Sequence, residues 1–164
     1  MNDRRVVRRA SGAFSPRETE GSTDAAGLRF AVVCSRWNPT VTEGLLRSAL
    51  RALRQHGAHE EDIEVIRVPG AFELAAAAKI AVRRADAVIA LAAIIKGETN
   101  HHDVLAHAVS AALATLSASE GLPIGFGVLT CDSMEQARAR MEKGAEASLA
   151  AIEIANLRRR RRAR

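Results

Sequence analysis

Cysteine is nearly absent from this chain, and histidine shows no metal-binding pattern. Cys34 and Cys131 match neither a zinc motif nor a CxxC redox motif. Both end predicted buried strands, so we expect free thiols, although their sequence separation alone leaves a disulfide open. His101, His102 and His107 lack the i, i+4 spacing that presents two imidazoles on one helix face. The sequence therefore predicts no metal site.

Long hydrophobic runs are also missing. The apolar stretch 87–95 is too short to span a bilayer, and the arginine-rich beginning lacks the apolar segment of a signal peptide. Acidic residues at Asp3, Glu18, Glu20 and Asp24 argue against a transit peptide. We therefore expect a cytoplasmic protein without a membrane partner, and 164 residues suffice for one domain.

Most of the chain has no excess of basic over acidic residues, despite a net charge of +5. Six arginines lie in residues 158–164, and without them the net charge is −1. Such a run is typical of a disordered, solvated tail; the alternative is that it binds nucleic acid or other polyanions weakly and without specificity. Because aromatic and basic residues are not interleaved either, we expect nucleic acid to be an unlikely partner.

Four apolar segments alternate with four helix-forming segments. We expect strands over residues 29–35, 62–68, 87–95 and 123–130. We expect helices from Thr40 to Gly57, over residues 71–84 and 100–117, and from Ser133 towards Leu157. Capping boxes at Thr40–Glu43 and Ser133–Gln136 mark two of the helix starts. The third helix carries one apolar stripe: Val104, Leu105, Ala108, Ala111, Ala112 and Leu116.

This alternation predicts an α/β fold: a flavodoxin-like three-layer α/β/α sandwich with a four-stranded parallel sheet. The domain would cover residues 29–157, between a disordered or loosely attached arm (1–28) and a basic tail (158–164). Alanine-rich helical segments at 72–81 and 106–114 present broad, weakly polar faces, which indicates packing between subunits.

Unusual residues gather where predicted strands end, the edge at which open α/β sheets bind ligands. The chain has no tyrosine and five other aromatic residues. Three of these, Trp37, Phe72 and Phe126, fall in this set, with Phe126 near the end of the fourth strand. Aromatic rings at one rim favour a site for a flat ring, while an ordinary core position for Phe72 or Phe126 is the alternative.

His101 would begin the third helix, where the helix macrodipole disfavours the imidazolium form. A neutral, partly exposed imidazole can transfer protons, while His102 should point elsewhere. A surface histidine or a helix-terminal cap remains the alternative. Gly97–Thr99 could offer N–H groups and a hydroxyl to an anion. Arg140 and Lys143, three residues apart on the last predicted helix, could hold a phosphate, or could be ordinary surface charges.

Six motifs follow one another in a distinctive order: RWN, VPGAFE, IIKGETNHHD, LPIGFGVLT, EQARAR and KGAEASLAAIEIANL. Together they resemble the 6,7-dimethyl-8-ribityllumazine synthase family over residues 29–157. The resemblance implies a transferase that condenses 5-amino-6-(D-ribitylamino)uracil with 3,4-dihydroxy-2-butanone 4-phosphate in riboflavin biosynthesis. No metal or organic cofactor is implied. A homopentamer, or a multiple of pentamers, with sites between subunits is implied, and riboflavin synthase is a candidate partner.

The resemblance also implies roles for individual residues. His101 corresponds to the proton-transfer residue, and Glu98, Thr99 and Arg140 to the phosphate site. Phe126 and Lys143 correspond to residues that reach the site from a neighbouring subunit. The remaining correspondences are to residues that hold the pyrimidine and its ribityl chain: Trp37, Ala71, Phe72, Glu73, Ala93, Ile94 and Ile95.

One departure from the family concerns the segment between Arg140 and Lys143, where only Met141 and Glu142 stand in place of a longer, glycine-containing turn. This shortening could fuse two helices into one and affect phosphate binding. The alternative function is therefore a non-catalytic lumazine- or flavin-binding shell protein.

Overall fold

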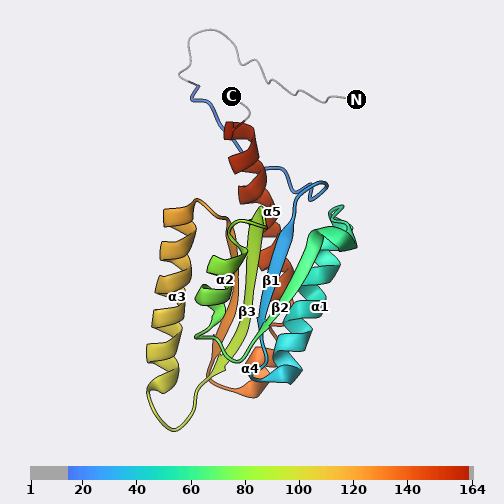
Figure 1. Cartoon of the computed structure of the whole chain (residues 1–164). Coiled ribbons are helices and arrows are strands. Elements are labelled where there is room, and N and C mark those ends of the chain that lie inside the picture. The colour runs from blue at the N-terminus through green and yellow to red at the C-terminus, as the bar shows by residue number, and fades with distance from the viewer. Residues whose placement is uncertain (1–14, 163–164) are drawn as a thin grey trace.

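The computed structural model describes residues 15–162 and contains one parallel sheet. Its strands are β1 (Phe30–Ser35), β2 (Ile63–Val68), β3 (Ala87–Ile95) and β4 (Ile124–Cys131). The sheet order is β2-β1-β3-β4, and every pairing is parallel (Figure 1). The predicted four-stranded parallel sheet is confirmed, and the ends of each strand agree with the prediction to within one residue.

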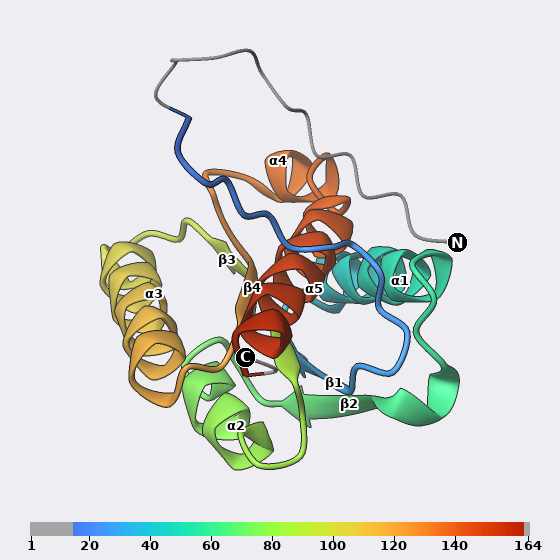
Figure 2. The same cartoon turned by 90° about the horizontal axis from the view of Figure 1, so that it is seen from above.

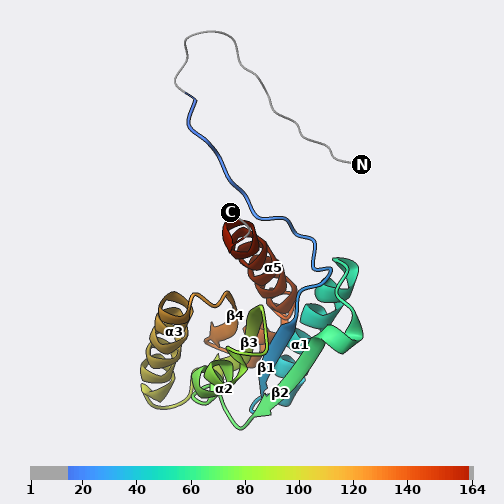
Figure 3. The ribbon, with the colours of Figure 1, turned by 45° about the horizontal axis from the view of Figure 1, so that its top comes forward.

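Helices cover both faces of the sheet (Figures 2 and 3). On one face lie α1 (Pro39–Gln55) and α5 (Lys143–Arg162), with the short α4 (Met134–Arg138) beyond the strand ends. On the other face lie α2 (Leu74–Ala81) and α3 (His101–Glu120). A single 3₁₀ turn, Glu60–Asp62, precedes β2. The three-layer flavodoxin-like sandwich is therefore confirmed.

Strand β3 joins two separate hydrophobic cores. Its side chains alternate between them, as a pleated strand requires. Ile89 and Leu91 pack with α1 and α5, whereas Val88 and Ile94 pack with α2 and α3. Eight of its nine residues are buried, because helices cover both faces of the sheet.

Helices α1 and α5 approach each other closely at Gly144. A β-carbon on Gly144 would lie 2.1 Å from the Leu45 carbonyl oxygen and 2.4 Å from the Ser48 hydroxyl. That hydroxyl donates to the Met141 carbonyl at 2.7 Å. Only glycine therefore permits this packing of backbone against backbone.

The helix starts and ends differ from the prediction in several places. Thr40 lies inside α1 rather than capping it, because Asn38 is the N-cap and Pro39 takes the first helical position. The Ser133 cap is confirmed, since its side chain accepts from the Gln136 N–H. Helix α2 is shorter than predicted, because irregular turns precede and follow it.

The last predicted helix is in fact two. A turn over residues 139–142 separates α4 from α5, so the shortened segment has not fused them. Arg140 lies in this turn and Lys143 begins α5, which means that the prediction of one helix face shared by the two was wrong.

The predicted stripe on α3 was also largely wrong. The residues of α3 that are fully buried are Val109 and Leu113. Leu105 and Leu116 pack against the core from its margin, while Val104 and the three alanines of the stripe are exposed. Because alanines occur on every side of this helix, its sequence does not define one apolar face.

The segment that precedes β1 packs against the domain. Asn156 on α5 donates to the Ser22 and Asp24 carbonyls at 2.8 Å each, and Ala25 and Leu28 are buried in the core. We therefore propose that the packed domain begins near Glu20; residues 1–14 of the expected arm lie outside the described residues. The arginines 158–162, expected as a disordered tail, instead continue α5, and cations are favourable at that end of a helix.

The close approach at Gly144 leads to a stability prediction. Gly144→Ala should lower the free energy of unfolding by about 2–3 kcal/mol or more, since the added methyl group meets backbone that cannot move aside cheaply. Urea denaturation of the purified variant would measure this. Gly97→Ala is the matched control, because a β-carbon there has no atom within 4 Å. Equal stability of the two variants would contradict the packing argument.

Candidate functional site

A pocket of about 600 Å³ opens at the carboxyl ends of β1 and β3. The sheet order reverses between these two strands, so the pocket lies at the topological switch point of the fold. Its volume suits a small organic ligand. The residues that line it are Trp37, Asn38, Gly70, Ala71, Phe72, Ala93, Ile94, Ile95, Lys96, Gly97, Thr99, His101, His102, Leu105 and Met134.

Two aromatic rings stand at the pocket's rim rather than in the core. Trp37 is 72% exposed and Phe72 is 70% exposed. Each follows a strand, Trp37 after β1 and Phe72 after β2, so the parallel sheet brings them to the same edge. The alternative of an ordinary core position for Phe72 is thereby excluded, and exposed rings can stack on a planar ligand.

The predicted pyrimidine-binding residues divide between the pocket and its surroundings. Ala71 and the last three residues of β3, Ala93, Ile94 and Ile95, line the pocket. Glu73 is not among the lining residues: its carboxylate accepts from the Gly70 N–H at 2.9 Å. In this chain Glu73 therefore closes the turn that presents Ala71 and Phe72.

Asn38 is a lining residue that the sequence prediction did not select. Its backbone is left-handed, with φ 56° and ψ 57°, a conformation that asparagine tolerates better than most residues. Its side-chain amide donates to the Ala93 carbonyl at 2.8 Å. Asn38 thus ties the turn that carries Trp37 to the end of β3. An asparagine directly before a helix-starting proline was the available signal.

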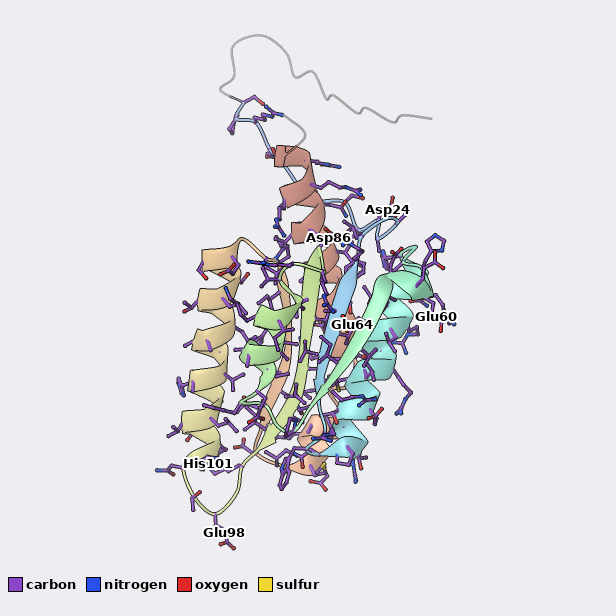
Figure 4. The ribbon with its side chains drawn as sticks, in the orientation of Figure 1. Asp24, Glu60, Glu64, Asp86, Glu98 and His101 are labelled. Carbon is purple, nitrogen blue, oxygen red and sulfur yellow. The ribbon has the colours of Figure 1, made fainter. Side chains whose placement is uncertain are left out.

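The turn between β3 and α3 brings Thr99 and His101 together. The Thr99 hydroxyl accepts from the His101 N–H at 3.4 Å, and both residues line the pocket. His101 is the first residue of α3, as predicted to within one residue. Glu98, in contrast, lies at the tip of the turn, and its side chain points away from the domain (Figure 4). Glu98 is not among the lining residues.

His102 also lines the pocket, so the expectation that it points elsewhere was wrong. Its side chain is only 12% exposed. One ring nitrogen lies 3.0 Å from the Thr99 carbonyl and the other 3.2 Å from the Asp103 carboxylate. The ring folds back over its own turn, and helical spacing alone does not reveal such a contact.

Three further predicted residues, besides Glu73 and Glu98, lie outside this pocket. Arg140 donates to the Gln136 carbonyl at 2.9 Å, and Lys143 pairs with Glu146. Phe126 is the third residue of β4, so its predicted position near the end of that strand was wrong. It is 49% exposed and lines a separate groove beside α3. Met134, at the start of α4, lines the pocket instead.

Arg67 of β2 contacts Glu43 of α1 and Cys34 of β1. The Arg67 guanidinium donates to Glu43, and this hydrogen bond lowers the pKa of the Glu43 carboxyl. The Arg67 guanidinium also lies 3.8 Å from the Cys34 sulfur. Burial nevertheless raises the pKa of the Cys34 thiol to about 11, and burial also raises the pKa of Cys131. Both cysteines are buried free thiols, as predicted.

The family of the chain follows from its match to a family model over residues 27–159, described as 6,7-dimethyl-8-ribityllumazine synthase. The chain belongs to the 6,7-dimethyl-8-ribityllumazine synthase family. The match covers the whole sheet, helices α1 to α4 and all of α5 except its last three residues. The lumazine synthase motifs of the sequence therefore correspond to the pocket's own walls: RWN contributes Trp37, VPGAFE contributes Phe72, and the KGET turn leads into His101.

Two further observations concern residues 15–162 alone. No helix in this range combines the length and the apolar character that crossing a bilayer requires. Within the same range, no three histidine, cysteine, aspartate or glutamate side chains converge as a metal site.

The contact between Asn38 and Ala93 can be tested by two substitutions. Asn38→Ala should cost about 2–3 kcal/mol of stability, because it removes the hydrogen bond and strains the left-handed backbone. Asn38→Gly should cost about 1 kcal/mol less than Asn38→Ala, because glycine accepts that backbone. Denaturant titration of both variants would give the difference. A glycine variant less stable than the alanine variant would refute the argument that alanine is strained in the left-handed backbone at this position.

The raised pKa of Cys34 predicts an alkaline loss of stability. Between about pH 9 and pH 11 an unfolded thiol ionises while the folded one stays protonated, so stability falls as pH rises through this range. The Cys34 contribution to this loss should be about 1 kcal/mol at pH 10. Comparing Cys34→Ala with the unsubstituted chain at pH 7 and pH 10 isolates it. Identical pH profiles for the two proteins would count against it.

Proposed function

We propose that this protein catalyses the condensation of 5-amino-6-(D-ribitylamino)uracil with 3,4-dihydroxy-2-butanone 4-phosphate. The products are 6,7-dimethyl-8-ribityllumazine, phosphate and two molecules of water. The observation that carries the proposal is the meeting of His101 with Trp37 and Phe72 in one pocket at the sheet's switch point. A proton-transfer group beside exposed aromatic rings fits a reaction that builds a ring on a planar pyrimidine.

In the proposed binding mode, the pyrimidine stacks against the Trp37 ring, and the apolar end of β3 receives it. Exposed aromatic rings favour such stacking, because the desolvated ring faces add dispersion and quadrupole attraction. The ribityl chain would extend along Ala71 and Phe72. Asn38 would act as a positioning residue, since its bond to Ala93 fixes the distance between the two walls.

The phosphate-bearing substrate would bind at the turn before α3. The Thr99 hydroxyl and the N–H groups of this turn are suited to an anion at a helix start. Lys96 adds a cation to the pocket lining. Arg140 would complete the phosphate site by turning away from the Gln136 carbonyl, to which it now donates; a charged hydrogen bond would contribute about 1.5–3 kcal/mol. Glu98 would contact the substrate only if the turn between β3 and α3 moved towards the pocket.

The site would be completed by a second subunit. Phe126 is half exposed and lies outside the pocket of its own chain, and Lys143 faces its own helix partner Glu146. We propose that both serve the neighbouring subunit's pocket within a homopentamer or a multiple of pentamers. The exposed alanine-rich face of α3 supports this arrangement, because it leaves an apolar surface for a second copy.

Proton transfer and proximity would share the catalytic task. Amine attack on the ketone, loss of water and elimination of phosphate each move a proton, and His101 is the group proposed to transfer it. Holding two reactive molecules together supplies much of the remaining rate. The reaction would take place in the cytoplasm and pass its product to the riboflavin-forming step, with riboflavin synthase as a candidate partner.

The proposal is tested by assaying lumazine formation from both substrates by absorbance. His101→Ala should lower kcat by roughly 10- to 100-fold, the low end of the effect of proton transfer, because proximity is retained. His107→Ala is the matched control, since His107 lies on the same helix but outside the pocket and should keep full activity. No product above the protein-free background, with the pyrimidine still bound, would instead favour the non-catalytic binding protein.

A further inference from the structure

The charge of this chain is divided sharply between its ends and its body. Residues 15–157 carry 14 Lys and Arg against 18 Asp and Glu, a net charge of −4. Residues 158–164 carry six arginines and no acid, and residues 1–14 carry four arginines and one aspartate. The positive charge is therefore concentrated in 21 residues, and the body of the domain would repel a polyanion.

The start of the described chain lies beside the end of α5. The Arg160 guanidinium on α5 donates to the Glu20 carbonyl at 2.7 Å, and Gly21 lies against the Glu153 backbone. The segment that leads back to residue 15 therefore starts beside the last turns of α5. Figure 1 shows this end of α5 extending beyond the strands. We use the term basic end for Arg158, Arg159 and Arg160 of α5, together with the arginines that follow them in the sequence, Arg161, Arg162 and Arg164.

The charges of the basic end are poorly neutralised by the domain. Arg159 donates to the Asn156 side-chain oxygen, and Arg160 to a backbone carbonyl, so neither bond cancels charge. Among the side chains that the structure describes, no carboxylate forms an ion pair with Arg158, Arg159 or Arg160. Asp86 shares a small cavity with Arg158, but it pairs with Arg29.

Contrary to the expectation from the sequence that nucleic acid is an unlikely partner, we propose that the basic end binds nucleic acid through its phosphate backbone, without reading base sequence. Every cation of residues 1–14 and 158–164 is arginine, whereas the three lysines lie elsewhere. Guanidinium groups bind phosphate oxygens in pairs, which a lysine ammonium cannot do. Consecutive helical positions differ by about 100°, so the side chains of Arg158, Arg159 and Arg160 leave α5 in different directions and can meet phosphates on several sides.

The composition of this end favours nucleic acid over a membrane or a specific acidic protein. Residues 158–164 contain no apolar residue larger than alanine, so they have nothing to insert into a bilayer. The same residues contain no aromatic side chain to stack on bases, which is why the binding reads no sequence. A specific protein partner would need an apolar anchor that these residues also lack.

The basic end and the candidate pocket lie at opposite ends of the strands. Asp86, beside the basic end, and His101, in the pocket, are far apart along the sheet in Figure 4. Nucleic acid bound at the basic end would therefore leave the pocket open. This inference does not rest on the proposed enzymatic function.

The test is fluorescence anisotropy with the full chain and a labelled single-stranded RNA of about 20 nucleotides, longer than one binding site. Six phosphate contacts predict a slope of about −4 for log K against log salt. Affinity should then fall by roughly 10²- to 10³-fold between 50 and 200 mM salt. Substituting Arg158, Arg161, Arg162 and Arg164 by glutamine leaves the contacts of Arg159 and Arg160 in place. It should flatten the slope by about 3 and weaken binding at low salt at least tenfold.

A control variant removes the same charge elsewhere. Arg47, Arg54, Arg83 and Arg84 are exposed, and their substitution by glutamine also lowers the net charge by four. This control should bind RNA within about threefold of the unsubstituted chain. Circular dichroism of both variants would verify that they are folded.

Three results would overturn the proposal. The first is an unsubstituted chain that does not bind RNA or duplex DNA at low salt. The second is equal weakening by the two sets of substitutions, since it would assign binding to overall charge. The third is a chain that binds vesicles of phosphatidylserine and phosphatidylcholine, or polyglutamate, more tightly than RNA at equal salt.

Discussion

The burial of β3 on both faces is the constraint on which the rest of this structure depends. A strand with no exposed face needs helices on both sides, and parallel neighbours whose connections supply those helices. Small side chains such as Ala90 and Ala92 let α2 and α3 come close on one side, while Ile89 and Leu91 meet larger partners on the other. The strand leaves the core abruptly at Lys96, and the turn that follows supplies the polar wall of the pocket.

The strands could be predicted from the sequence because their signal is local. Residues 87–95 form an apolar run bounded by Asp86 and Lys96, and the structure gives the same bounds. The buried face of α3 could not be predicted in this way. Its alanines make every face weakly apolar, and only its packing on α2 and β4 decides that Val109 and Leu113 are the buried residues. Local pattern fails where side chains do not distinguish one face from another.

The site shows the same limit. Strand order and the positions of unusual residues sufficed to bring Trp37, Phe72 and His101 to one edge of the sheet. The roles of Asn38 and His102 depended on contacts across turns, Asn38 with Ala93 and His102 with Thr99, which no periodicity encodes. The roles of Phe126 and Lys143 are open for a different reason. In the proposed assembly they contact a neighbouring subunit, which a single chain does not include. The site residues that could be predicted from the sequence are those whose positions follow from the course of the backbone alone.

The length of β3 has a further, electrostatic consequence. Nine residues at about 3.3 Å each separate its two ends by about 30 Å. Ions at physiological strength screen exposed charges beyond a Debye length of about 8 Å. The arginines at one end of the sheet therefore contribute almost nothing to the potential that an anionic substrate meets at the other end. The two ends are electrically independent, so changes of charge at one end leave the other unaffected.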